Sequence, residues 1–317
     1  MADSIEEYYV DNIDSSLCKL NRELLRTRRS YEYTVGMKIS KLLHAFKYFD
    51  IRAIKNALNN KKMHNKLKSH FKSNNIFLTF DPKIETCTRV AVYTAITGGY
   101  DIPIEPYYVP ENVDFFIITD MNIPAGSVWK KIDINLIEEI AELDNTRKAR
   151  FAKTHPHTFF KEYEYTVWID SNFKAVGDLS RFIKCVGSNI PFASNWHPDR
   201  NSIYTELEAC IVRKKDNAGL LRKQIDYYRE QGMPDDFGLI ETNMIVRKHN
   251  EKKCVDLMEL WWQEILTWSK RDQLSLPYVI WKAGYTMRDL GFIGTDVRDN
   301  TSVQIILHTV DYESPHM

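Results

Sequence analysis

The residues with the clearest chemical potential lie in VWIDSN, residues 167–172, where an apolar run ends at Asp170 and Asn172 follows two positions later. Side chains at positions i and i+2 of an extended chain point the same way. The oxygens of Asp170 and Asn172 can therefore face one hard cation, which can bridge to a diphosphate and act on it as a Lewis acid. The usual pattern has two aspartates, so the neutral Asn172 should weaken such a site. A strand that ends in an aspartate also commonly just opens a turn, and that interpretation stays open.

A glycine pair lies in TAITGGYD, residues 94–101, directly after another apolar run. Gly98 and Gly99 would let the backbone approach a nucleotide closely, because they carry no Cβ. The pattern is neither a Walker loop nor GxGxxG. An ordinary glycine turn is the alternative.

A basic segment follows in DNTRKARFAKTHPH, residues 144–157. Arg147, Arg150 and Lys153 are three residues apart, which places them roughly on one helical face. Arginine can bind a diphosphate through two parallel hydrogen bonds. The alternative is a solvated basic helix end, which the helix dipole favours. The two histidines of the segment lack the spacing of a zinc-binding helix, so zinc is not expected.

Polar and aromatic side chains gather in PFASNWHPDRNSIYTELE, the segment from Pro191 to Glu208, which could hold an acceptor sugar. Its candidate acceptor contacts are Trp196, His197, Tyr204 and Glu206.

Two further segments carry acids near the start of an apolar run. Glu241 lies at the start of a strand in GLIETNMIVRKHN, residues 238–250, and Asp272-Gln273 lies in SKRDQLSL, residues 269–276. An acid here could act as a general base or stabilise an oxocarbenium-like centre. Asp272 is equally well explained as the N-cap of the following helix.

The elements that must position these residues alternate between short apolar strands and helices. Strands are expected at 89–93, 115–119 and 165–169, and a helix at 132–150. This alternation predicts a mostly parallel sheet covered on both faces, with its ligand at the carboxyl ends of the strands. The segment 94–101, Asp120 and Asp170 all fall at those ends.

Length and composition narrow the class of protein. The chain has 317 residues, of which 44% are hydrophobic, enough for one large domain with an appendage. Its formal net charge is zero, which gives no overall bias toward nucleic acid. Five scattered cysteines without a CxxC pair argue against a disulfide framework and favour a reducing, cytoplasmic compartment. We find neither an N-terminal apolar leader nor an apolar run of membrane-spanning length.

Residues 1–80 form a predicted helical extension, and residues 81–317 the predicted α/β domain. Basic residues dominate from 17 to 72, and apolar residues recur there at helical spacing. This extension could dock on the anionic inner leaflet of a membrane, associate with a second copy as a homodimer, or simply present a solvated basic face.

Taken in order, the motifs resemble the DUF616 family of plant and bacterial glycosyltransferases. The resemblance runs from about Arg89 to His308 and includes YTAITGGYD, RKARFAKTHPH, WIDSN, YTELEA, GLIETNMIVRKHN, the pair Trp261-Trp262 and RDQLSL. It implies a GT-A-type (Rossmann-like) fold, a mostly parallel sheet flanked by helices, with a nucleotide-sugar donor, UDP-sugar above all, and Mn²⁺ or Mg²⁺.

The resemblance also implies roles for individual residues. The nucleotide pocket would comprise Thr94, Gly98, Gly99, Tyr100, Asp101, Asp120 near the nucleoside, and Arg147 and Lys153 near the phosphates. The metal would be held by Asp170, Asn172 and His308. Glu241, Asp272 and Gln273 would be the catalytic residues beside the transferred sugar.

The N-terminal segment LLRTRRSYEYTVGMKI, residues 24–39, is similar to basic helices attached to many bacterial polysaccharide glycosyltransferases. The resulting prediction is a cytoplasmic enzyme of capsule or O-antigen synthesis, peripheral to the inner membrane, that glycosylates a glycan or lipid-linked acceptor. One alternative is a nucleotide-sugar-binding scaffold that has lost catalysis, as Asn172 suggests. Another, nucleic-acid binding through the basic helices, lacks a recognition motif and is not expected.

Overall fold

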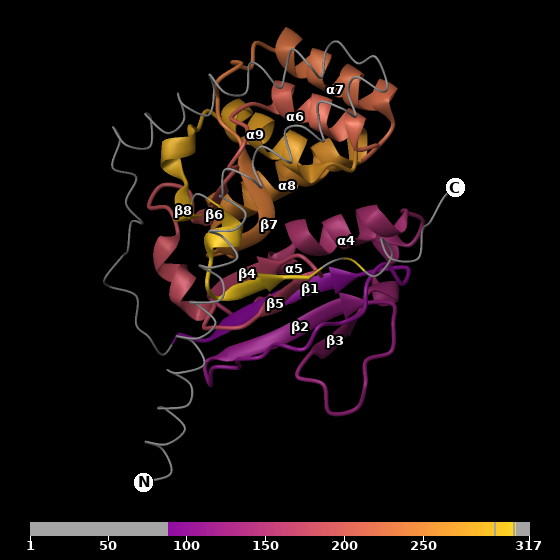
Figure 1. Ribbon diagram of the computed structural model, residues 1–317, viewed down its shortest axis with the longest axis vertical. Helices are drawn as coiled ribbons and strands as arrows, with labels where there is room; N and C mark the ends of the chain where they lie inside the picture. The colour runs from indigo at the N-terminus through magenta and orange to yellow at the C-terminus, as the bar shows by residue number, and fades with distance from the viewer. Residues whose placement is uncertain (1–87, 295, 307, 309–317) are drawn as a thin grey trace, which may run out of the picture. The chain divides into compact units, whose positions relative to one another are not determined.

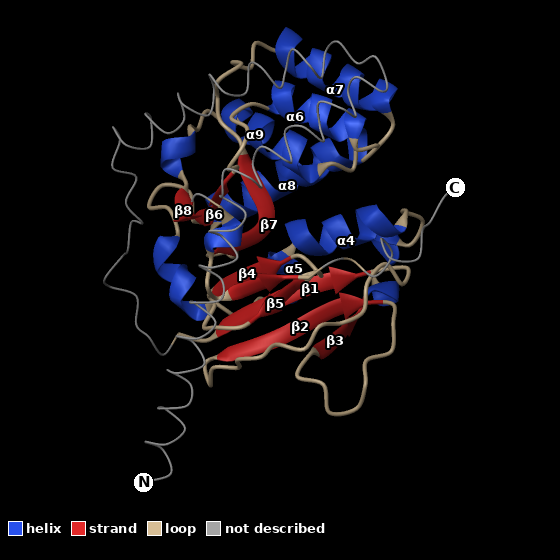
Figure 2. Ribbon diagram, viewed as in Figure 1, coloured by secondary structure: helices blue, strands red, loops and turns tan. Residues whose placement is uncertain are grey.

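The computed structural model describes residues 88–294, 296–306 and 308 (Figures 1 and 2). The predicted extension 1–80, its basic surface 17–72 and the predicted boundary at residue 81 lie outside these residues. In the described part of the chain, no helix is both long and apolar enough to span a membrane.

The central element is a seven-stranded sheet with the strand order β3-β2-β1-β4-β7-β6-β8. β1, β2, β3 and β4 pair in parallel, as do β6 and β8, whereas β7 runs antiparallel to both β4 and β6. The strands are β1 (Val90–Ile96), β2 (Val113–Thr119), β3 (Lys130–Asp133), β4 (Tyr165–Ile169), β6 (Phe192–Trp196), β7 (Ile240–Arg247) and β8 (Gly291–Gly294). The predicted mostly parallel sheet is confirmed.

A second, two-stranded sheet pairs β5 (Phe173–Ala175) with β9 (Val303–Ile305). The helices of the described residues are α4 (Asn145–Thr154), α5 (Pro156–Phe159), α6 (Ile203–Val212), α7 (Ala218–Glu230), α8 (Lys252–Thr267) and α9 (Asp272–Lys282). Short 3₁₀ turns are η1 (Ile134–Leu136), η2 (Glu138–Ile140), η3 (Ser180–Cys185), η4 (Met287–Asp289) and η5 (Val297–Asp299).

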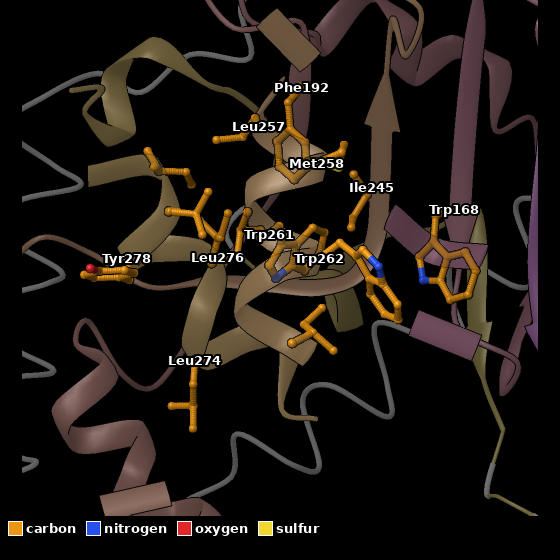
Figure 3. Packing of buried hydrophobic residues seen from close by; sticks show 14 of the residues in the cluster. Trp168, Phe192, Ile245, Leu257, Met258, Trp261, Trp262, Leu274, Leu276 and Tyr278 are labelled. Carbon is orange, nitrogen blue, oxygen red and sulfur yellow. The ribbon is translucent and has the colours of Figure 1, made fainter. Parts of the chain in front are cut away.

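The sheet is buried on both faces, because alternate residues of its strands enter two different hydrophobic clusters. In β4, Trp168 faces the larger cluster, while Val167 and Ile169 face the smaller one. The larger cluster includes residues of α4, α6, α7, α8 and α9 (Figure 3). Burial on both faces explains why these strands read as continuous apolar runs in the sequence.

The larger cluster fixes the start of α9. Trp261 of α8 is fully buried, and its indole N–H donates a hydrogen bond of 2.9 Å to the carbonyl of Asp272. In Figure 3, Trp261 lies between Leu276 of α9 and Ile245 of β7. The first turn of α9 is therefore held by the core rather than by a side-chain cap.

The helix predicted at 132–150 is wrong in its first half. Residues 130–133 form the edge strand β3, the turns η1 and η2 follow, and α4 begins only at Asn145. Asp133 and Asp144 each accept a hydrogen bond from a backbone N–H two or three residues on, so each caps a new element. The two caps divide a segment whose composition alone would support one helix.

Candidate active site

A pocket of about 220 Å³ opens at the edge of the sheet, lined almost wholly by charged and polar side chains. Asp170 follows β4, Glu241 begins β7, and His197 follows β6. These three meet because β7 runs antiparallel to both neighbours, so its first residues lie beside the last residues of β4 and β6. The pocket therefore lies at the carboxyl ends of β4 and β6, where the ligand is predicted to bind.

A buried ion pair forms the centre of the pocket wall. Lys153 Nζ of α4 lies 2.6 Å from Asp272 Oδ2 of α9, and both side chains are almost fully buried. Asp272 also lies 3.3 Å from Arg150 Nε and accepts a hydrogen bond of 3.1 Å from the Thr242 hydroxyl. Lys153 Nζ in turn lies 3.5 Å from Asp170 Oδ1. Lys153 therefore connects Asp170, a residue of the candidate metal motif, to Asp272 and its neighbour Gln273.

The surroundings determine the charge of both partners. Burial alone would raise the pKa of Asp272, but the cations of Arg150, Lys153 and Arg271 hold it well below the ordinary value. Burial lowers the pKa of Lys153, and the carboxylates of Asp170 and Asp272 oppose that effect. Asp272 is therefore an anion near neutral pH. It is not the N-cap of α9, since Arg271 occupies that position.

The basic segment of α4 divides between structure and pocket. Arg147 donates to Asp144 and to the carbonyls of Ile265 and Trp268, so its guanidinium ties α4 to the end of α8. Arg150 and Lys153, one and two turns later, line the pocket instead. Of the three basic residues predicted to share one helical face, Arg147 is thus the one that does not line the pocket.

Glu241 is the second buried acid of the pocket. Its carboxylate lies 3.4 Å from an Arg298 nitrogen and accepts a hydrogen bond of 3.4 Å from the Val297 N–H. Burial raises the pKa of Glu241 to about 7, with Asp296 adding to the effect and Arg298 opposing it. A carboxyl group that titrates near neutrality can accept a proton from a sugar hydroxyl and release it again.

His197 also lines the pocket, and we call the part of the pocket around it the His197 end. Its Nδ1 accepts hydrogen bonds from the backbone N–H groups of Asp199 and Arg200, and its Nε2 lies 2.7 Å from an Arg200 nitrogen. Burial, together with the charges of Arg200, Arg298 and Arg213, lowers the pKa of His197 to about 3. Arg200 Nε also donates to the buried Glu206. His197 is therefore neutral at physiological pH.

The metal-motif residues lie at the ends of β4 and β9. Trp168 Nε1 donates to Asp170 Oδ1 at 2.9 Å, and Asn172 Nδ2 donates to the carbonyl of Ile306 at 3.1 Å. His308 Nδ1 lies 2.8 Å from Asp101 Oδ2, which also accepts from the Ser171 hydroxyl. The pairing of β9 with β5 brings His308 beside the residues that follow β4. Within the described ranges there is no cluster of three or more His, Cys, Asp or Glu side chains that could hold a metal.

The predicted nucleotide residues gather at the ends of β1 and β2. Gly98 donates its N–H to Asp120 Oδ2 at 2.9 Å, while Asp120 Oδ1 and the Thr94 hydroxyl are buried and have no hydrogen-bond partner among the described residues. Gly98 and Gly99 both have positive φ, +63° and +67°, which explains the glycines. Buried polar atoms without a partner are costly in a native fold, so both are candidate ligand contacts.

Tyr100 and Asp101 contact residues of the predicted metal site. The Tyr100 ring lies 5.1 Å from the His308 ring, and Asp101 contacts His308 and Ser171. These two residues therefore join the predicted nucleotide loop to the predicted metal residue.

The acceptor candidates separate into two groups. His197 and Glu206 line the pocket, whereas Trp196 stacks on Phe292 with ring centroids 4.5 Å apart. The Tyr204 hydroxyl donates to the carbonyl of Met233 at 2.9 Å. Neither Trp196 nor Tyr204 lines the pocket.

The sequence prediction missed several pocket residues. These are Asp199, Arg200, Arg213, Arg271 and Arg298. Arg150, in contrast, was among the candidates for diphosphate binding because of its three-residue spacing from Lys153. The other arginines come from four loops and helix ends, and no spacing relates them.

A helix-covered, mostly parallel sheet with a charged pocket at the carboxyl ends of its strands defines an α/β protein of the class that commonly binds ligands at that place. The chain belongs to the family of the TOD1/MUCI70 glycosyltransferase-like domain, whose model matches residues 61–290. The resemblance drawn from the ordered motifs is thereby confirmed, and the chain is a glycosyltransferase-type protein.

One relative is the "Probable hexosyltransferase MUCI70" of Arabidopsis thaliana, which is 23% identical over 230 residues. The match covers 62% of this chain and 38% of the plant protein, so the chain spans well under half the length of that relative.

Two solved glycosyltransferases have a loosely similar structure. The bifunctional glycosyltransferase WbbM in its apo form is 13% identical, with a TM-score of 0.38 over 68% of this chain and 40% of that one. The galactosyltransferase LgtC in complex with donor and acceptor sugar analogues is 9% identical, with a TM-score of 0.35 over 60% of this chain and 70% of that one.

Proposed function

We propose that this protein transfers a sugar from a nucleotide-sugar donor, UDP-sugar above all, to a glycan or lipid-linked acceptor in bacterial surface-polysaccharide synthesis. The observation that carries the proposal is the row Asp170, Lys153, Asp272 and Gln273, which lines one pocket at the edge of the sheet. As part of this proposal, the protein is located in the cytoplasm, contacts the inner leaflet of the membrane through residues 17–72, and forms a homodimer.

The donor set at the end of β4 fits a hard divalent cation, Mn²⁺ or Mg²⁺. Asp170 would supply a carboxylate oxygen, Asn172 an amide oxygen and His308 an imidazole nitrogen. Asn172 Nδ2 already donates to Ile306, which keeps its amide group in one orientation. A carboxylate on Nδ1, here that of Asp101, is the usual support of a metal-binding histidine. A bound cation would neutralise the diphosphate as it departs.

Gln273, Asp272 and Glu241 would bind the sugar and carry out proton transfer. Gln273 Nε2 donates to the carbonyl of Ile240 at 3.1 Å, which orients its amide beside Asp272. Asp272 is held as an anion, so it suits hydrogen bonds to sugar hydroxyls and electrostatic stabilisation of positive charge on the sugar. Glu241 has the pKa of a base that works near neutrality. Two carboxyl groups whose pKa values are set apart suggest two different roles.

The direct test compares wild type with Asp170→Ala and, as a control, with Asp226→Ala, an exposed acid paired with Arg229 on α7. Each protein is incubated with Mn²⁺ and a panel of radiolabelled nucleotide sugars, and donor hydrolysis and transfer are measured. We expect Asp170→Ala to retain its circular dichroism spectrum and lose activity, while Asp226→Ala retains both. Full transfer by Asp170→Ala would overturn the metal assignment.

Asn172 also supports a second candidate, a nucleotide-sugar-binding scaffold without catalysis, because it replaces a charged ligand with a neutral one. This candidate predicts nucleotide binding by calorimetry without hydrolysis or transfer for any donor. Restoring the acid with Asn172→Asp would then strengthen Mn²⁺ binding. Turnover by the wild-type protein would exclude it.

A further inference from the structure

The far end of the pocket is strongly cationic. Arg200 lies after β6, Arg213 caps the end of α6, Arg271 precedes α9 and Arg298 lies on η5, and all four line the pocket. Arg200 contacts the His197 ring at 2.7 Å, and the charges of Arg213 and Arg298 also act on it. Four separate elements therefore bring positive charge to one place.

Arg271 is the unusual member of this group. Its Nε is shielded from solvent and has no hydrogen-bond acceptor, and none of the carboxylates in the described residues lies within 4.0 Å of its nitrogens. Its contacts are the thiol of Cys210 and the more distant charges of Asp272 and Glu206. A guanidinium Nε that is shielded from water and lacks an acceptor is costly unless a ligand supplies one.

The acids at this end pair with two of the four arginines, because Arg298 lies 2.8 Å from an Asp296 oxygen and 3.4 Å from a Glu241 oxygen. Glu206 is held by Arg200, and Asp199 contributes one further charge. The pKa of Glu241 is raised to about 7 by burial, so Glu241 is only partly charged near neutrality. In contrast, Arg150 and Lys153 at the other end face the two carboxylates of Asp170 and Asp272. Of the pocket arginines, Arg213 and Arg271 are thus the two with no carboxylate of the described residues within 4.0 Å.

We propose that the His197 end binds an anionic group on the acceptor, a carboxylate or a phosphate monoester, with Arg271 as its central contact. The inference rests on the proposed function, because it assigns the Asp170 end to the donor and the opposite end to the acceptor. The planar guanidinium of arginine matches both anions through paired N–H groups. His197 is neutral and accepts hydrogen bonds from backbone N–H groups, so the positive charge of the subsite comes from the arginines.

The experiment measures binding of three probes by calorimetry at low salt, with nucleoside diphosphate and Mn²⁺ present. Methyl glucuronoside carries a carboxylate, glucose 6-phosphate a phosphate monoester, and methyl glucoside neither. We expect at least one acidic probe to bind wild type ten-fold or more tightly than methyl glucoside, with a preference that falls as salt rises. The stronger acidic probe identifies which of the two anions the subsite takes.

Arg271→Met removes the charge and keeps much of the volume, and we expect it to lose the preference for acidic probes. Arg271→Lys keeps the positive charge but loses the paired N–H groups, so it should retain part of the preference for acidic probes. Arg222→Met, at an exposed position on α7, is the matched control and should bind as wild type does. Circular dichroism checks that each variant is folded, and Arg298→Met replaces Arg271→Met if the latter is not.

Equal binding of all three probes by wild type, or an acidic preference that survives in Arg271→Met and Arg298→Met, would overturn the proposal. Donor hydrolysis without acceptor separates this outcome from failure of the proposed function. If hydrolysis persists in wild type and Arg271→Met while no acidic preference exists, the transferase assignment stands and the anionic subsite does not. Acidic preference without any nucleotide binding or hydrolysis would support the subsite and contradict the donor site.

Discussion

At the scale of single residues, the pocket holds two buried carboxyl groups with opposite properties. Asp272 faces Lys153, Arg150 and Arg271, and these cations outweigh the effect of burial on its pKa. Glu241 faces Arg298 at 3.4 Å and lies near Asp296, so burial prevails and its pKa rises to about 7. The distance and number of the neighbouring cations decide which group stays charged.

The Lys153–Asp272 pair should couple stability to activity. Asp272→Ala leaves the buried Lys153 ammonium without its nearest anion, so we expect a loss of roughly 3 kcal/mol in the free energy of unfolding. The double variant Lys153→Met/Asp272→Leu removes both charges and should recover most of that loss without recovering transfer. Urea unfolding and a transfer assay check both statements. If the double variant is as unstable as the single one, the pair contributes little beyond packing.

Glu241 should give the fold a distinct pH dependence. Because its pKa is higher in the folded protein, about 7 against an ordinary 4.5, the folded state binds more protons between these values. Its contribution to stability therefore falls as pH rises through that window. Glu241→Gln removes this effect. As pH rises from 4 to 8, the free energy of unfolding of the variant should therefore increase relative to that of wild type by a total on the order of 3 kcal/mol. Parallel stability profiles for the two proteins in urea would contradict the assignment.

At the scale of elements, the site depends on how the loop after β1 meets α4. The Thr97 hydroxyl donates to the carbonyl of Asn145 at 2.7 Å, and Gly98 donates to Asp120. A Cβ on Gly98 would lie 1.9 Å from the Asn145 amide nitrogen, whereas one on Gly99 would meet nothing within 4 Å. Both glycines have positive φ, but only Gly98 is also restricted by packing.

This difference gives a matched pair of variants. Gly99→Ala should cost only the strain of the left-handed conformation, about 1 kcal/mol. Gly98→Ala adds a clash with Asn145 and should lower the unfolding midpoint clearly further. Thermal unfolding of the two variants side by side tests this, and equal midpoints would show that Asn145 moves away without cost.

The sequence predicts these elements unequally. β1, β2 and β4 could be predicted because burial on both faces leaves continuous apolar runs in the sequence. The candidate metal motif could be proposed because Asp170 and Asn172 come directly after β4. The split of 132–150 was missed, since composition does not reveal two caps within a helical pattern. The roles of Arg271 and Asp101 were missed because each depends on partners far away in the chain. Asp101 and His308, for example, are 207 residues apart.

At the scale of the whole domain, the sheet assembles the site from distant segments. Lys153 and Asp272 are 119 residues apart, and Asp170 directly follows β4, which lies between them in the chain. Antiparallel β7 brings Glu241 to the same edge, and pairing of β9 with β5 brings His308 to the residues after β4. A donor site of this kind exists only in the folded domain, so a donor nucleotide should stabilise it by mass action.

The most direct measurement is the thermal unfolding of wild type and Asp170→Ala against nucleoside diphosphates and nucleotide sugars, each with and without Mn²⁺. We predict that one nucleotide raises the wild-type midpoint selectively and only with Mn²⁺, and that Asp170→Ala loses this rise while unfolding cooperatively. No rise with any nucleotide, or an equal rise in the variant, would contradict a metal-assisted donor site at Asp170.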